Sequence, residues 1–138
     1  RIRMIKEETS LIENICNDAM KIGQLMEKQK KLLLNVFGKR CENALKALEE
    51  GAVKKYVFEP SLRVVWIVVG KEKDYQVLPE ANYCSCDDFY YRVIDGNTTV
   101  CYHLLAQKLS EALNKYEVIT DSDLLYEVLM KDWRFIRR

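Results

Sequence analysis

Three of the five cysteines and the only histidine of this 138-residue chain lie within one short stretch, and this feature constrains the fold most. They form the pattern C-x-C-x14-C-x-H, whose four members are Cys84, Cys86, Cys101 and His103. Three thiolates and one imidazole match the tetrahedral donor set of a structural zinc site. One residue separates the two donors of each pair, so a tight turn or the first turn of a helix can direct both to one ion. The pattern predicts a zinc module over residues 83–106.

The alternatives to zinc explain the pattern less well. Taken alone, each cysteine would be interpreted as a small buried core residue. The joint pattern favours a metal, because two mirrored pairs occur and the only histidine belongs to one of them. Iron–sulfur ligation normally uses four cysteines. The short link between Cys84 and Cys86 disfavours a disulfide between them.

The same four residues indicate that the zinc is structural. A catalytic zinc usually keeps one coordination position for water and has a general base nearby. Here protein side chains fill all four positions, and no H-x-E or H-E-x-x-H motif is present. We expect Asp87 and Asp88 to accept hydrogen bonds near the site or to cap a helix. The chain is therefore not expected to be an enzyme.

Helical periodicity dominates both ends of the chain. Apolar residues at steps of three and four predict a helix from residue 5 to about residue 37, with a kink or loop near Lys30 and a stop at Gly38. A second helix is predicted from 39 to 50. After Cys101 the helical period returns up to Leu113, and a final helix is predicted from about Asp121. Its buried face is expected to hold Leu124, Leu125, Val128 and Leu129.

Between these helices the period changes to that of strands. Residues 53–58, 62–69 and 74–78 are rich in β-branched and aromatic side chains, and residues 82–84 could begin a fourth strand. The short connections predict an antiparallel meander, because parallel strands need longer crossovers. The fold class is therefore α+β: N-terminal helices, a small antiparallel β-meander, a Cys3His zinc finger and C-terminal helices. We assign residues 1–37 to an N-terminal amphipathic helical segment, either packed on the domain or projecting from it, and residues 38–138 to the zinc-finger domain.

Charge limits what the surface can bind. Twenty-two basic and 21 acidic residues give a net charge of +1, which argues against a surface devoted to nucleic acid. Local basic patches remain as candidates for contacts with a nucleic-acid backbone. The candidates are Lys54, Lys55, Arg63, Lys71, Lys73, Arg134, Arg137 and Arg138. An ordinary solvated face and a docked terminal helix are the plainer interpretations of these residues.

No apolar run approaches the ~20 residues needed to span a bilayer, so no membrane association is expected. No secretory signal is visible in the first residues either. We expect an intracellular protein with reduced thiols, cytoplasmic in a prokaryote and nuclear in a eukaryote.

The ligand pattern also carries a family resemblance. C-x-C-x(n)-C-x-H is the signature of SWIM-type zinc fingers, and "YCSC…CYHLLA" closely resembles the SWIM subunit of the Shu recombination-mediator complex. The helix ending near "FG" and the segments "HLLAQKLSEAL" and "DSDLLYEVLM" extend the likeness from about Leu32 to Met130.

This resemblance implies a function. SWIM subunits of this kind bind zinc through the positions of Cys84, Cys86, Cys101 and His103. They form heteromers with RecA-family recombinase paralogues and support homologous recombination on single-stranded DNA. The resemblance therefore implies a zinc-stabilised adaptor that meets DNA through its complex. The alternative is a stand-alone nucleic-acid-binding SWIM finger, which the near-neutral net charge disfavours.

Overall fold

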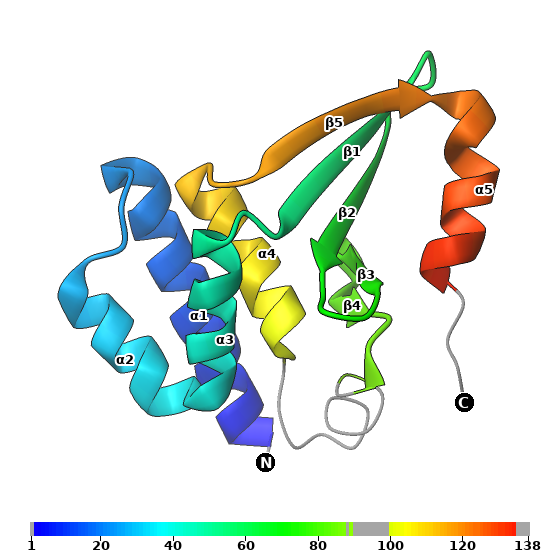
Figure 1. Ribbon diagram of the computed structural model, residues 1–138. Coiled ribbons are helices and arrows are strands. Elements are labelled where there is room, and N and C mark those ends of the chain that lie inside the picture. The colour runs from blue at the N-terminus through cyan, green and yellow to red at the C-terminus, as the bar shows by residue number, and fades with distance from the viewer. Residues whose placement is uncertain (1, 88, 90–99, 135–138) are drawn as a thin grey trace.

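The computed structural model describes residues 2–87, 89 and 100–134 (Figure 1). The helices are α1 (Ile2–Ile22), α2 (Glu27–Phe37), α3 (Lys39–Glu49), α4 (Tyr102–Leu113) and α5 (Asp123–Arg134), with a short 3-10 turn η1 (Pro79–Ala81). The strands are β1 (Val53–Glu59), β2 (Arg63–Val69), β3 (Asp74–Leu78), β4 (Tyr83–Cys84) and β5 (Glu117–Ser122). This mixture of helices with one five-stranded sheet confirms the α+β class.

The predicted N-terminal helix is in fact two helices. The break lies at residues 23–26, ahead of the predicted kink near Lys30, because Gly23 takes a positive φ of 87° that ends α1. Gly38, with φ 57°, separates α2 from α3 as expected. Ile12, Ile15 and Ala19 of α1 are buried, and α1 packs against α4. The N-terminal helix is therefore packed on the rest of the chain.

The sheet contains the predicted meander and one further strand. Its order is β4-β3-β2-β1-β5, and β1 to β4 pair antiparallel. The sequence analysis missed β5, which pairs parallel to β1 with Lys54 opposite Glu117. Between β1 and β5 the chain therefore forms β2, β3, β4 and α4. The last helix was predicted to start near Asp121, whereas α5 begins at Asp123, where the Leu124 N–H donates to Ser122 Oγ at 3.1 Å.

Helices cover both faces of the sheet. On one face α4 lies against the strands, with α1 and α3 packed behind it; α5 lies on the other face (Figure 1). Successive side chains of β2 point to opposite faces of the sheet, so this strand contributes to a hydrophobic cluster on each face. Trp66 and Val68 belong to the larger cluster under α4, and Val65 and Ile67 belong to a smaller cluster with α5. The zinc motif lies at the edge of the larger core.

The predicted buried face of α5 is wrong at three of its four residues, since only Leu129 packs against the core. Leu124 is 89% exposed and Val128 is 63% exposed, and Leu125 is also exposed. The buried residues are Met130 and Trp133, with Tyr126 and Leu129 partly buried beside them. The helix is anchored by Asp123, whose carboxylate accepts hydrogen bonds from the Ser61 N–H and Oγ in the β1–β2 turn. This anchor turns the most apolar side of α5 away from the sheet.

None of the described helices is both long enough and apolar enough to cross a bilayer.

Candidate metal centre

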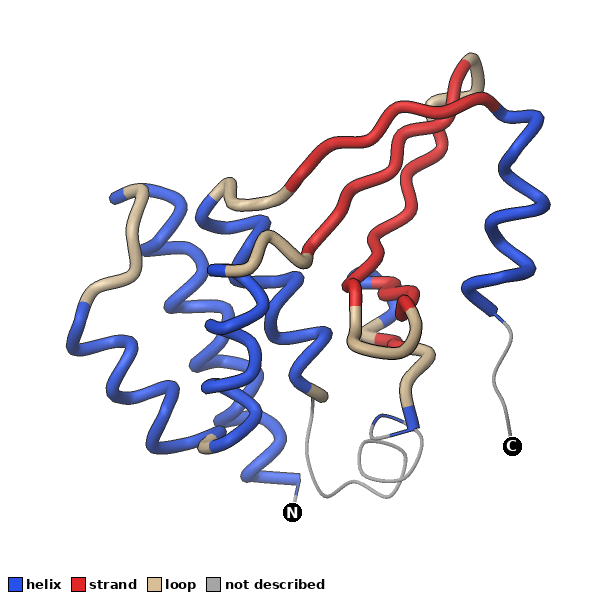
Figure 2. The backbone as a smooth tube through the Cα atoms, in the orientation of Figure 1, coloured by secondary structure: helices blue, strands red, loops and turns tan. Residues whose placement is uncertain are grey.

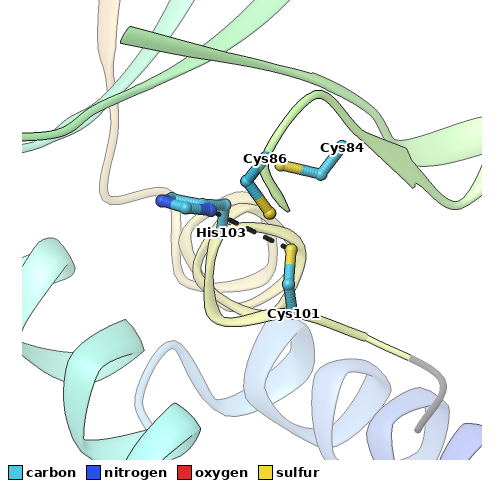
Figure 3. Close-up of side chains that lie close together, drawn as sticks. All are labelled: Cys84, Cys86, Cys101 and His103. Atoms are coloured by element: carbon cyan, nitrogen blue, oxygen red, sulfur yellow. Dashed lines mark hydrogen bonds between the residues drawn. The ribbon is translucent and has the colours of Figure 1, made fainter. Parts of the chain in front are cut away.

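Two short elements position the four predicted ligands. Cys84 ends β4, and Cys86 follows two residues later. Cys101 is the residue that precedes α4, and His103 lies in the first turn of that helix. Figure 3 shows the four side chains converging between the loop after β4 and the start of α4.

The loop that carries the first pair is pinned to the sheet through Ser85. The Ser85 N–H donates to the Gln76 carbonyl at 3.0 Å, and the Gln76 N–H donates to Ser85 Oγ at 3.1 Å. In addition, the Phe89 N–H donates to Cys86 Sγ at 3.3 Å. Backbone N–H donation to a sulfur stabilises a thiolate. These bonds fix the turn that directs both sulfurs to one point.

The geometry of the cluster fits a zinc ion. The four ligand atoms lie within 4.8 Å of one another, and all four residues are buried. A tetrahedral site with Zn–S bonds of about 2.3 Å separates its sulfurs by about 3.8 Å. Small side-chain movements would therefore close the cluster on the ion. Three buried thiols and an imidazole with no acidic partner in this cluster are also the donor set that zinc prefers.

His103 presents one particular nitrogen to the sulfurs. Its Nδ1 lies 4.0 Å from Cys101 Sγ, whereas Nε2 is buried and without a hydrogen-bond partner. The rings of Tyr75 and Tyr102 flank the imidazole, with centroids 4.3 Å and 3.8 Å away. The two tyrosines hold the ring so that Nδ1 faces the metal position. Spacing along the chain gave no sign of Tyr75, because its strand is 28 positions upstream of His103.

Contacts among the thiols shift their pKa values in opposite directions. Hydrogen bonds from Cys101 and Cys84 hold the pKa of Cys86 well below its usual range. The pKa of Cys84 is raised by its hydrogen bonds with Cys101 and Cys86 and by burial. For Cys101, the hydrogen bond with Cys84 lowers the pKa, but the bond with Cys86 and burial outweigh it and raise the pKa to about 12. Without a metal, one thiolate is therefore shared by two neutral thiols.

Such a site binds zinc and has no position left for a substrate. Three sulfurs and one nitrogen complete a tetrahedral shell, and the site lies inside the protein. The metal supplies a cross-link between the sheet and α4. The chemistry of the cluster is therefore that of a structural zinc, which neutralises the buried thiolates and fixes two segments together.

The aromatic and acidic residues near the motif are only partly described. Phe89 is buried and its ring contacts Tyr83 at 5.1 Å between centroids, so it packs beside the metal site. Asp87 is exposed. Asp88, Tyr90 and Tyr91 lie outside the described residues.

The predicted basic residues do not gather into one stripe. Lys54 and Lys55 are neighbours on β1, so their side chains point to opposite faces of the sheet. Lys54 Nζ forms an ion pair with Glu117 Oε1 at 2.8 Å. Lys55 lies over the Trp66 ring. Arg63 lies over the Tyr126 ring on the α5 side. Lys71 and Lys73 are in and next to the β2–β3 turn, where Lys73 lies over Tyr75.

The remaining basic candidates are in the C-terminal region. Arg134 ends α5, and Arg137 and Arg138 lie outside the described residues. The structure therefore brings the four metal ligands together but leaves the described basic candidates at separate places.

Comparison with known proteins gives several relatives. Zinc finger SWIM domain-containing protein 7 of Mus musculus is 35% identical over 105 residues, which make up 74% of this chain and 68% of the mouse protein. The homolog of the same protein in Dictyostelium discoideum is 29% identical over 97 residues, or 69% of this chain and 62% of that protein. An uncharacterized protein of Archaeoglobus fulgidus is 34% identical over 101 residues and is covered to 79% of its length.

No family model matches the chain, and no solved structure matches it significantly. The match spans less than two thirds of the Dictyostelium relative. It spans 68% of the mouse protein at 35% identity, and the described cluster is a Cys3His zinc site. The chain therefore belongs to the family of zinc finger SWIM domain-containing protein 7.

Proposed function

We propose that this chain is a zinc-stabilised adaptor that pairs with a RecA-family recombinase paralogue and supports homologous recombination on single-stranded DNA. The observation that carries the proposal is the closed Cys3His site of a SWIM-family chain, which cross-links the sheet to α4 and offers no open metal position. A metal that holds the fold keeps the surfaces around it in shape, which supports a role as an adaptor.

The sequence supports a role without ATP chemistry of its own. Nucleotide-binding loops of the G-x-x-x-x-G-K-[ST] type need glycines that let the backbone surround the phosphates. The two Gly-Lys pairs of this chain, at 38–39 and 70–71, are followed by Arg40 and Glu72 and have no such glycines before them. An adaptor of this kind would depend on its partner for ATP binding.

DNA contact is proposed to arise through the complex. The net charge is +1 and the basic candidates on the described strands lie on both faces of the sheet, so these residues form no continuous basic surface of the kind that tracks a nucleic-acid backbone. A stand-alone finger would need such a surface. The proposal therefore expects weak DNA binding by the isolated chain and stronger binding by the heteromer.

The test is affinity purification of the tagged full chain from its native host, followed by mass spectrometry. A RecA-type ATPase should be recovered in stoichiometric amounts, and the purified pair should bind single-stranded DNA more tightly than the chain alone. The Cys101→Ser variant should lose the partner because its zinc site is broken, whereas Cys41→Ser, outside the site, should retain it. Recovery of no such ATPase, with tight salt-dependent DNA binding by the chain alone, would favour the stand-alone finger.

A further inference from the structure

The two edges of the sheet are protected to different degrees. Within the described residues, the edge strand β4 has only two residues, whereas the edge strand β5 has six. Figures 1 and 2 show β5 along the outside of the sheet, with no described helix or strand beside its free edge. Half of the backbone N–H and C=O groups of an edge strand point away from the sheet and can pair with another chain.

β5 lacks several of the devices that prevent such pairing, and its charged side chains are both acidic. Natural edge strands are often short, or carry lysine, proline or a bulge. The sequence of β5 is EVITDS, which contains neither lysine nor proline, and its register with β1 is continuous over all six residues. Regular, unprotected edges of this length are the templates used in β-strand addition.

The side chains of β5 define two different faces. Val118 pairs in register with Lys55, lies on the α4 side of the sheet and is 56% exposed. Glu117 and Asp121 lie on the opposite side, with the partly buried Ile119 between them. Because Glu117 already pairs with Lys54 at 2.8 Å, an incoming strand would meet the exposed Val118 on one face, and Asp121 and this ion pair on the other.

We propose that the free edge of β5 binds an extended segment of a protein partner in which β-branched apolar residues alternate with lysine or arginine. The backbone groups of the edge require an extended occupant, because a helix satisfies its own backbone internally. Alternation follows from the period of two along a strand. One basic position would face Asp121 and another would join the Glu117–Lys54 ion pair, and the apolar positions would face Val118.

Charge disfavours a second copy of this chain as the occupant. Each copy would bring Asp121 and the Glu117–Lys54 ion pair and no basic residue on β5, so pairing of two β5 edges brings the two Asp121 carboxylates together without a new cation. A basic partner segment neutralises them instead. The inference names the interaction surface of the proposed adaptor and in that respect rests on the proposed function.

The test uses the full zinc-loaded chain and three synthetic peptides: KVKVKV, the acidic EVEVEV, and KVPVKV, whose proline removes a strand hydrogen bond. NMR titration should show that KVKVKV shifts the amides of residues 117–122 and protects them from hydrogen exchange. Affinity for EVEVEV and KVPVKV should be at least tenfold lower. No binding of KVKVKV at millimolar concentration, equal binding of the acidic peptide, or shifts confined to another surface would overturn the inference.

Matched variants locate the contact. Val118→Lys introduces a protective edge lysine and should weaken KVKVKV binding at least tenfold. Val64→Lys is the control, because Val64 is 47% exposed and lies on the same face but two strands further in. It should leave binding within twofold of the unchanged chain. Thermal melting and zinc content verify that both variants fold; equal losses in both variants, or a β5-mediated dimer in sedimentation, would contradict a partner strand at this edge.

The same variants separate this inference from the proposed function. If the RecA-type ATPase is recovered with Val118→Lys as well as with the unchanged chain, the surface is wrong while the adaptor role stands. If no ATPase is recovered but KVKVKV binds β5 as described, the surface stands and the proposed partner is wrong.

Discussion

Helices α4 and α5 are each 12 residues long and cover opposite faces of the sheet, yet they are held in different ways. In α4, eight residues are buried, and two of the four metal ligands lie at its start, one as the residue before the helix and one in its first turn. In α5, the buried residues are Met130 and Trp133, while its most apolar stripe is exposed. The comparison teaches that α4 is fixed by metal and core together, whereas α5 is held by a small cluster and an anchor at its start.

The largest expected effect is that of removing the metal. Structural zinc in small modules contributes about 10–16 kcal/mol of apparent binding free energy, which is of the same order as or above the net stability of a small domain. Chelation should therefore remove hydrogen-exchange protection from β4 and α4 before the cluster under α5 is affected. Exchange measured by mass spectrometry with and without chelator checks this. Earlier loss in α5 than in α4 would reverse the comparison.

Acid should act on α4 through the same site. The raised pKa values of Cys84 and Cys101 leave both thiols protonated near neutral pH, so zinc must displace about two protons on binding. Lowering the pH therefore weakens zinc binding, by about 100-fold per pH unit for two protons. Competition titrations with a zinc chelator between pH 6.5 and 8 measure this slope. Cys41→Ser should show the slope of the unchanged chain, and a flat profile would mean that the thiols are already ionised.

Leucine truncations compare the two helices directly. Leu105 of α4 is fully buried, so Leu105→Ala should lower the free energy of unfolding by about 2–5 kcal/mol. Leu124 of α5 is 89% exposed, so Leu124→Ala should change it by no more than about 0.5 kcal/mol. Urea unfolding of the zinc-loaded variants gives both values. A large loss for Leu124→Ala would show that α5 buries its apolar stripe.

A loss of stability smaller than that of Leu105→Ala is expected at the start of α5. Ser122→Ala removes the hydroxyl that accepts the Leu124 N–H and should cost about 1 kcal/mol. Ser122→Asp keeps an acceptor at this position and should restore most of the stability. Exchange of the first-turn amides of α5 identifies where the loss occurs. Similar losses in both variants would indicate that the hydroxyl does not cap the helix.

The metal site could be predicted from the sequence because its information is local. Each pair of ligands is separated by one residue, and chemistry alone selects zinc for three thiols and an imidazole. The helices and the meander were also predictable, since periodicity and glycine positions are local signals. The break after α1 was misplaced because Gly23 ends the helix before the polar stretch that suggested a kink.

Long-range packing explains what the sequence did not reveal. β5 pairs with a strand 63 positions upstream, and four of its six residues are polar, as suits a strand at an edge. The apolar stripe of α5 suggested a buried face, but the anchor of Asp123 to the β1–β2 turn sets the rotation of the helix. Likewise, Lys54 and Lys55 point to opposite faces because their segment forms a strand of the sheet.

The parallel pairing of β5 with β1 has a consequence for biosynthesis. Residues 84–103 hold all four zinc ligands and leave the ribosome before residues 117–134. Local contacts form faster than contacts between distant segments, and domains fold from the N-terminal side during translation. The nascent chain can therefore capture its ion while the outer strand is still in the exit tunnel, and one side of β1 stays unpaired until residue 122 has left the tunnel.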